Sequence, residues 1–334
     1  MTVPAVAALG VVVLALGAAL AHASPSLLVP VECEIGAACV LQNHVDHDPG
    51  PAGRDYRCGF LTYDGHKGTD IRVIDSEAFR SGVVVRAAAA GRVRAVRDGV
   101  ADVNVRTLGK EAVAGREAGN SVVIDHGDGW ETQYGHLRKG SIAVRAGDEV
   151  TAGQRLGVVG LSGHTEFPHL HFEVRHRGRA VDPFVGRDGA EACRLGARPL
   201  WAAPALEVLG YVATGLLGAG ISGEPPRLID SGVDGERTAR FAAGSAAAVF
   251  WVQIYGVQAD DVEELRLIGP AGRVLAERRR PIERTRAQWL AYLGLRRRDG
   301  AWPAGRYRGE YVLYRGSPAE AVLSIVREVE LPAQ

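Results

Sequence analysis

The chain has 334 residues, of which 46% are hydrophobic and 23% are charged, so disorder along the whole length is excluded. The length exceeds that of a typical single domain, and two domains are therefore expected. The 39 basic residues balance the 39 acidic residues, which removes any general electrostatic argument for binding nucleic acid or an anionic membrane. We expect no nucleic-acid partner.

Residues 1–23 have the composition of a secretory signal peptide. They carry no charged side chain, and the apolar run from Ala5 to Leu20 precedes Ala-His-Ala at 21–23, a pattern typical of signal cleavage. The run is shorter than the ~20 residues needed to span a bilayer, although the usual basic start is missing. Cleavage after Ala23 predicts an exported protein, periplasmic or secreted, with no stable membrane span; an uncleaved anchor is the alternative.

The remaining chain contains four cysteines: Cys33, Cys39, Cys58 and Cys193. An even number in an exported protein indicates two disulfide bonds, for which three pairings are possible. Zinc binding by thiolates is the alternative, but no pair has the C-x2-C spacing typical of such sites. Residues 24–57 are rich in Asp, Gly and Pro, so they are predicted to form a disulfide-pinned lead-in rather than a domain.

Short strands separated by turns are predicted from residue 58 to about 185. Runs of β-branched residues at 83–85, 103–105, 121–125 and 157–159 indicate strands. Asp128-Gly129 follows the third run and predicts a β-hairpin. Helical periodicity is scarce, so we expect an all-β domain.

A linker at residues 196–225 and a small β-sandwich at 226–334 are predicted for the rest of the chain. The apolar stretch 200–221 resembles a membrane span, but Pro204 and Glu207 interrupt it, so a buried linker strand is expected there. Strand patterns return at 249–255, 265–268, 306–314 and 322–331, and residues 286–295 are predicted as a short helix. No catalytic residues are evident in this part.

Two runs of three arginines stand out in the sandwich, at 278–280 and 296–298. Residues 205–334 nevertheless contain 17 Arg against 16 acidic residues, so this part of the chain is nearly neutral. We interpret the runs as solvated surface. A site for a polyanion is the alternative.

Histidines and one aspartate form three patterns that carry chemistry. His66 and Asp70 lie four residues apart across a glycine, so a turn can direct both inward. His169 and His171 lie two apart in a strand-like run, which places both imidazoles on one face, ~6–7 Å apart. His136 ends the predicted hairpin and supplies another imidazole.

Together these residues predict a metal hydrolase, although each histidine alone is more readily explained as a structural residue. Neutral imidazoles and a carboxylate suit Zn²⁺, and three protein ligands with an open fourth position make the catalytic type of site. Two further imidazoles can move a proton and stabilise an oxyanion. The residues alone do not say which of His169 and His171 is a ligand.

The chain resembles the lysostaphin-type (LytM-like) zinc endopeptidases that cut bacterial cell-wall peptides. The resemblance rests on H-x3-D at 66–70, Tyr-Gly-His-Leu at 134–137 and Pro-His-Leu-His-Phe-Glu-Val at 168–174, and it covers roughly residues 58–185. It implies an antiparallel β-sheet groove in a peptidase domain, residues 58–195. The roles it implies are one Zn²⁺ per chain on His66, Asp70 and His171, with His136 and His169 as the catalytic pair.

The expected function is that of an exported zinc metallo-endopeptidase acting on peptidoglycan stem or cross-bridge peptides. A non-catalytic cell-wall binder or amidase activator on the same scaffold is the alternative, but such relatives usually lack the zinc ligands. A protease of general extracellular proteins with the same chemistry is a third reading.

Two local features depart from the family pattern. The family usually has a small Ser-Thr-Gly-like stretch before Pro168, whereas this chain has His164-Thr-Glu-Phe167, whose bulk and charge are expected to alter substrate choice. The insertion at about 100–119 is expected to form a wall of the groove.

The other histidines are not assigned to the site. His126 is interpreted as a turn residue. His44 and His47 are interpreted as part of a solvated loop, with a second metal site as the alternative.

We predict the disulfide pairings Cys33–Cys39 and Cys58–Cys193. The first pair lies six positions apart in a turn-rich segment. The second pair brackets the predicted peptidase domain, and closing so long a loop contributes ~4–5 kcal/mol in the loop-entropy model.

Overall fold

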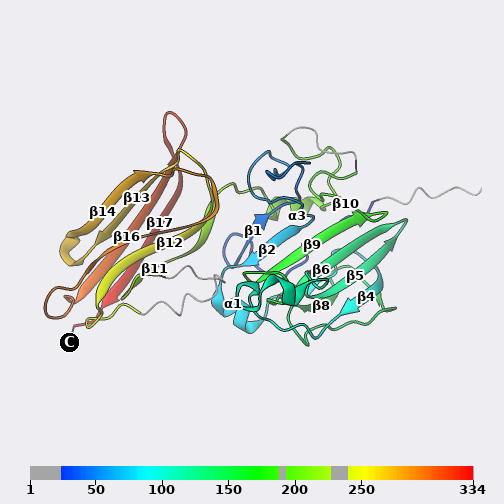
Figure 1. Cartoon of the computed structure of the whole chain (residues 1–334), viewed down its shortest axis with the longest axis horizontal. Coiled ribbons are helices and arrows are strands. Elements are labelled where there is room, and N and C mark those ends of the chain that lie inside the picture. Colours follow the sequence, from blue (N-terminus) through cyan, green and yellow to red (C-terminus); the bar gives the residue numbers. More distant parts are fainter. Residues whose placement is uncertain (1–23, 188–192, 227–239, 334) are drawn as a thin grey trace, which may run out of the picture.

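The computed structural model describes residues 24–187, 193–226 and 240–333, so the predicted signal peptide lies outside the described residues. The described chain is almost all β, as expected, and every pairing between its named strands is antiparallel. Figure 1 shows two β regions side by side, a large sheet at the right and a sandwich at the left. No helix among the described residues is long and apolar enough to cross a membrane.

An eight-stranded sheet forms the first region, in the order β1-β2-β9-β6-β5-β4-β7, with β10 paired to β9. Its strands are β1 (Cys39–Asn43), β2 (Thr69–Val73), β4 (Gly91–Arg97), β5 (Asn120–Gly127), β6 (Trp130–Leu137), β7 (Glu149–Val150), β9 (His169–His176) and β10 (Arg179–Ala180). A separate pair consists of β3 (Val84–Arg86) and β8 (Arg155–Val158). The predicted hairpin at Asp128-Gly129 is confirmed, because β5 and β6 pair across it.

Strand β9 shows how the sequence separates core from groove. Leu170, Phe172 and Val174 are buried in the main hydrophobic core. Because side chains alternate between the two faces of a strand, His169 and His171 point to the opposite face. The period-two spacing of the histidines thus places both on the polar face of the sheet.

The helices of this region are short: α1 (Ser76–Ser81), α2 (Val105–Leu108), the 3-10 helix η1 (Lys110–Val113) and α3 (Ala203–Val208). The strand predicted at 103–105 is wrong, because α2 begins there. The Asn104 side chain accepts a hydrogen bond from the Arg106 amide and caps the helix, which outweighs the strand propensity of two valines.

Residues 24–57 contribute directly to the sheet region. They supply edge strand β1, and Leu27 is completely buried against the core beside Trp201. The two disulfides are Cys33–Cys39 and Cys58–Cys193, as predicted. The lead-in is therefore an integral part of this fold rather than an appended segment.

The second region is a β-sandwich of two sheets. One contains β11 (Gly215–Ser222), β12 (Ala247–Val257) and β15 (Arg286–Arg296), in that order. The other has the order β14-β13-β16-β17, with β13 (Val262–Ile268), β14 (Val274–Pro281), β16 (Gly305–Arg315) and β17 (Glu320–Leu331). A 3-10 turn, η2 (Pro270–Gly272), lies between β13 and β14. Phe250, Leu265 and Tyr311 are buried between the sheets.

One sequence expectation fails in the sandwich. Residues 286–295, predicted as a helix, form strand β15, in which Ala291 and Leu293 enter the core at a spacing of two. The strand expected within the predicted linker, residues 196–225, is present as β11, which pairs with β12 along its length. The glycines and small residues of 215–222 suit this edge strand, because Trp251 lies flat against Gly220.

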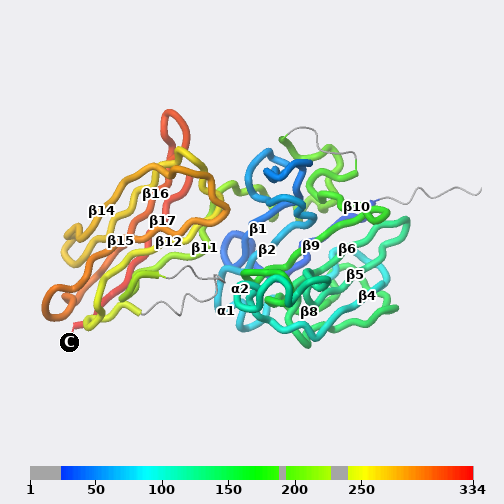
Figure 2. The backbone as a smooth tube through the Cα atoms, in the orientation of Figure 1, coloured from blue at the N-terminus to red at the C-terminus, as the bar shows by residue number. Residues whose placement is uncertain are grey.

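A small apolar cluster joins the two regions. Leu217 of β11 and Tyr255 of β12 are buried together with Val40 of β1 and Leu61. Figure 2 shows the chain passing from the sheet region into β11 on the side of the sandwich that lies nearest β1. The sandwich thus contacts the edge of the large sheet away from β4 and β7.

Candidate active site

The histidines and the aspartate singled out in the sequence converge on the polar face of the large sheet. Asp70 of β2 lies directly across from His171 of β9, and Gly135 of β6 lies on the other side of His171. His136 follows Gly135, and His66 lies in the turn before β2. Three strands that are adjacent in the sheet but distant in sequence therefore place these groups in one site.

His66, Asp70 and His171 form a group that could hold a metal ion. The Nε2 atom of His66 lies 3.2 Å from Asp70 Oδ2, and Nδ1 of His171 lies 2.8 Å from Asp70 Oδ1. One ligand atom from each of the three residues lies within 4.8 Å of the others. Two imidazole nitrogens and one carboxylate oxygen are a donor set that fits Zn²⁺.

Hydrogen bonds from neighbouring residues orient this group. The Nδ1–H of His66 donates to the backbone carbonyl of His44 at 2.7 Å, which leaves Nε2 as the free nitrogen. The Asn43 amide donates to Asp70 Oδ2 at 2.9 Å. Such outer contacts fix the orientation of metal ligands and raise their affinity.

His136 and His169 lie beside this group, with ring centroids 4.5 Å apart. Nδ1 of His136 is 2.7 Å from the carbonyl of Ser162, and Nδ1 of His169 is 2.9 Å from the carbonyl of Phe167. Each Nδ1–H can therefore donate to a fixed acceptor, which leaves Nε2 free. His136 also has φ 59°, a strained left-handed conformation of the kind found at functional sites.

A second metal-competent group, His136, His169 and His171, shares one residue with the first. It contains no carboxylate, so a divalent cation in it would keep its full charge. Among the described residues no other group of this kind occurs.

Burial and mutual charge set the protonation of the site. Burial disfavours the Asp70 carboxylate, but the facing imidazoles of His66 and His169 outweigh this, so the pKa of Asp70 lies well below its usual value. Burial, together with the neighbouring His169 and His171, lowers the pKa of His136 well below its usual value. The site therefore combines an ionised carboxylate with a neutral imidazole at His136.

The site opens into a groove of about 560 Å³ along the sheet. Its lining residues are Tyr63, Gly65, His66, Lys67, Glu117, Ala118, Gln133, His136, His164, His171, Glu173 and Arg175. A second hollow of about 350 Å³ over β4 and β5 shares Glu117, Ala118 and Gln133 with it. Neither hollow is lined by residues 24–57, so the lead-in leaves the groove open.

The insertion at 100–119 forms one wall of the groove, as expected, through Glu117 and Ala118. It is tied to the loop 162–167 by an ion pair between Arg106 and Glu166 at 2.7 Å and by a hydrogen bond from the Val105 amide to the Thr165 carbonyl at 3.0 Å. This loop supplies the carbonyls that accept from His136 and His169. The wall therefore supports the positions of both imidazoles.

The family model for Peptidase family M23 matches residues 64–183. This part of the chain is an M23 domain. All five site residues, from His66 to His171, lie within the matched segment.

Relatives are similar to the M23 domain only over short stretches. The peptidoglycan DD-endopeptidase ShyA of Vibrio cholerae is 49% identical over 65 residues, which are 20% of this chain and 15% of that protein. The DD-carboxypeptidase/endopeptidase Mpg of Neisseria meningitidis is 40% identical over 91 residues, 27% of this chain and 19% of that protein. The chain thus spans less than a fifth of the length of either relative.

Two solved structures are similar to part of the chain. A zinc-containing peptidase from Vibrio cholerae is 28% identical, covers 42% of this chain and 39% of its own, and has a TM-score of 0.28. The catalytic domain of lysostaphin from Staphylococcus simulans is 23% identical, covers 42% of this chain and 85% of its own, and has a TM-score of 0.27.

Arg72 is a residue of the M23 domain that the sequence interpretation missed. Its side chain is completely buried, donates to Gln42 at 2.7 Å, and holds its guanidinium 4.2 Å from the centre of the Phe167 ring. Burial lowers its pKa to about 9. Phe167 in turn lies 4.9 Å from the His169 ring, and Arg72 is the cross-strand partner of His169, so Arg72 packs beside the site. The signal in the sequence is an arginine directly between two apolar residues of β2.

His44, His47 and His126 lie outside the group of five site residues. His44, expected in a solvated loop, is buried among the rings of Tyr56, Phe184 and Tyr211. His47 lies 2.8 Å from Asp182. Neither belongs to a metal-competent group among the described residues. His126 lies near the end of β5, and its Nδ1 contacts the Ala90 carbonyl at 2.7 Å.

Proposed function

We propose that this protein is an exported, zinc-dependent endopeptidase that hydrolyses peptide bonds in peptidoglycan. The observation that supports it most directly is the meeting of a complete zinc donor set with two further imidazoles, each held at Nδ1 by a backbone carbonyl. A binder or amidase activator on the same scaffold needs neither feature.

His66, Asp70 and His171 are the proposed ligands of one Zn²⁺ per chain. Asp70 supplies a negative charge, and the contacts from Asn43 and from the His44 carbonyl orient the donor atoms. The alternative group, with His136 and His169 as ligands, would use the two imidazoles that catalysis requires. When bound by these residues, zinc would supply a positive charge that polarises a carbonyl and lowers the pKa of a bound water.

His136 and His169 are the proposed catalytic pair. Each has its Nδ1–H directed to a carbonyl, so each keeps Nε2 as the proton acceptor. His136 lines the groove, and Nε2 of His169 lies 3.5 Å from Asp70 Oδ1. One imidazole takes the proton of the attacking water, and the other, when protonated, donates to the carbonyl oxygen that gains negative charge. Their neighbouring position, 4.5 Å between centroids, allows both to serve one scissile bond.

The substrate and compartment are inferred from three features. Two relatives of the M23 domain, both from Vibrio cholerae, are named peptidoglycan DD-endopeptidases. The groove is open along the sheet, as an extended peptide substrate requires. Two disulfides and the apolar residues 1–23 indicate an oxidising compartment outside the cytoplasm, periplasmic or extracellular.

The unit that carries this activity is proposed to be the large sheet with its lead-in, and the sandwich is proposed to be a second domain that begins at β11. The separate hydrophobic cores of the two regions support this division.

Digestion of purified peptidoglycan tests the proposal. The full chain, expressed with export and loaded with zinc, is incubated with sacculi, and soluble fragments are identified by mass spectrometry. Release of peptides cut within the stem or cross-bridge is expected, together with about one zinc per chain by elemental analysis. A zinc-loaded, folded protein that releases no fragment but increases the activity of an added amidase would instead support the activator. Cleavage of casein at a rate equal to that of sacculi would support a general protease.

A further inference from the structure

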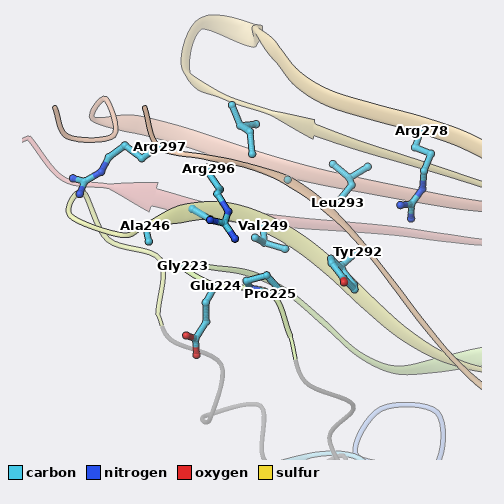
Figure 3. Close-up of a pocket in the computed structure, with 13 residues that line it drawn as sticks. Gly223, Glu224, Pro225, Ala246, Val249, Arg278, Tyr292, Leu293, Arg296 and Arg297 are labelled. Carbon is cyan, nitrogen blue, oxygen red and sulfur yellow. The ribbon is translucent and has the colours of Figure 1, made fainter. Parts of the chain in front are cut away.

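One residue of the first arginine run and two residues of the second run line the same pocket of the sandwich. Arg278 belongs to β14 in one sheet, Arg296 ends β15 in the other sheet, and Arg297 follows it. All three line a pocket of about 780 Å³. Figure 3 shows Arg278 and Arg296 on two sides of this pocket, with Tyr292 between them. We refer to it as the arginine pocket.

Arg278 shares its carboxylate partner, Glu263, with Arg280. Glu263 accepts from Arg280 Nε at 2.6 Å and from Trp289 Nε1 at 2.7 Å, and the Arg278 guanidinium lies 3.7 Å away from the same carboxylate. The Nε atom of Arg278 is buried without a hydrogen-bond partner. Two arginines thus share one acid, and Arg278 retains hydrogen-bonding capacity.

The charges around the pocket are unbalanced. Arg296 and Arg297 are exposed, and their side chains make no hydrogen bond or ion pair within the described part of the chain. An adjoining hollow of about 730 Å³ shares these two residues and adds Arg273 and Arg298. Among the described residues, five arginines and two acids, Glu224 and Asp299, line the two hollows.

The other residues of the pocket suit a ligand that contains a ring better than a linear ligand made of charged groups. Val249 contributes apolar surface to the lining, and Tyr292 is 44% exposed. The volume lies within the range typical of sites for small ligands, about 300–1,000 Å³. An exposed aromatic face can contact the C–H face of a sugar ring, and guanidinium groups bind carboxylate or phosphate in a fixed geometry.

We propose that the arginine pocket binds an acidic saccharide. The sugar ring packs on Tyr292, and its carboxylate or phosphate lies between Arg278 and Arg296. A membrane surface or a nucleic acid fits less well, because both require a wide basic surface and residues 205–334 have only one more Arg than acidic residues. The pocket shares no residue with the groove, so this proposal is independent of the peptidase activity.

Isothermal titration calorimetry of the full chain tests the proposal with defined probes. Trigalacturonic acid supplies carboxylates, mannose 6-phosphate supplies a phosphate, and maltotriose is the neutral control. Both acidic saccharides are expected to bind about tenfold or more tightly than maltotriose at low salt, because the charge-assisted contacts are absent from the neutral sugar. Their binding should weaken as salt increases.

Variants locate the site. The double change Arg278→Gln and Arg296→Gln is expected to weaken binding of both acidic saccharides about tenfold or more. Tyr292→Ala should weaken saccharide binding while leaving binding of inorganic phosphate unchanged. Arg284→Gln is the matched control: this exposed arginine precedes β15, whereas Arg296 ends it, so the two are separated by the length of the strand.

Several outcomes would overturn the proposal. These are no binding of either acidic saccharide, undiminished binding by the double variant, or equal losses in Arg284→Gln. Binding to phosphatidylglycerol vesicles without binding to saccharides would identify a membrane site instead. Circular dichroism confirms that each variant is folded, and the single exposed change Arg296→Gln replaces the double variant if that one does not fold. Because the assay involves no hydrolysis, its result does not depend on whether the protein cleaves peptidoglycan.

Discussion

The groove of the M23 domain and the arginine pocket of the sandwich hold their polar groups in opposite ways. In the groove His66, His136 and His169 each bond a backbone carbonyl, and Asp70 accepts from Asn43. In the pocket Arg296 and Arg297 make no such bonds to described residues. Groups that are fixed in advance suit catalysis, because they need not reorganise during the reaction. Charges left unpaired instead suit binding of an oppositely charged ligand.

Among changes to the groups that are held in place in the groove, removal of Asp70 is expected to have the largest effect. Asp70→Ala leaves two imidazoles without the carboxylate between them, so zinc should fall from one per chain to below about a tenth, and digestion of sacculi should cease. Elemental analysis of the purified variant measures the metal. The control is Asp64→Ala, an exposed carboxylate in the preceding turn, which should retain zinc. Full zinc occupancy in Asp70→Ala would remove this residue from the ligand set.

Substitutions in the proposed catalytic pair, His136 and His169, should reduce turnover without reducing metal binding. His136→Ala and His169→Ala are expected to keep zinc but to lose ~10²–10⁴-fold in kcat, the usual contribution of a positioned acid or base. Sacculus digestion with saturating enzyme measures the loss, and zinc content is determined in parallel. His126→Ala, which alters a histidine outside the groove, serves as the control. If either pair variant loses its zinc together with its activity, the residue belongs to the metal group instead.

The disulfides test how far the order of the groove depends on covalent links. The loop-entropy model assigns ~5 kcal/mol to Cys58–Cys193, whose cysteines are 135 residues apart, and ~2 kcal/mol to Cys33–Cys39, which are six apart. Replacing each pair by serine should lower the free energy of unfolding in that order. Urea unfolding followed by tryptophan fluorescence gives the values. A larger loss from the short loop would show that strain or local packing, rather than loop length, determines the effect.

The smallest effect is expected from the wall of the groove. Arg106→Gln or Glu166→Gln frees the loop 162–167, so kcat should fall about threefold to tenfold while KM changes little, because the loop orients imidazoles rather than substrate. The double variant should lose no more than either single one. Glu77→Gln breaks the exposed Glu77–Arg80 pair in α1 and should leave kcat unchanged. A change in KM alone would assign the wall to substrate binding.

The sequence predicted the local geometry of the site well, for a physical reason. The spacing of His169 and His171 depends only on the period of a β-strand, and His66 and Asp70 are near neighbours in the chain. The hairpin that ends at His136 was predicted from its turn residues alone. In each case the relevant contacts are short in sequence, so a motif is sufficient to place them.

Features that depend on distant contacts were not predictable in this way. His44 is buried because Tyr56, Phe184 and Tyr211, far apart in sequence, enclose it. The helix predicted at 286–295 is wrong because the spacing of its apolar residues fits the periodicity of a helix as well as that of a strand. Hydrogen bonding to β12 stabilises the strand in the folded chain. The placement of residues from both arginine runs in one pocket likewise depends on how β14 and β15 align at the edge of the sandwich.

The acceptors that orient His66, His136 and His169 are all main-chain carbonyls, those of His44, Ser162 and Phe167. A substitution at any of these three positions changes the side chain but leaves the acceptor in place. Insertion or deletion of a single residue in the same loops, by contrast, displaces the carbonyl itself. The alignment of the imidazoles should therefore depend more on the length of these loops than on the identity of His44 and Ser162, whereas the Phe167 ring also contacts His169 directly.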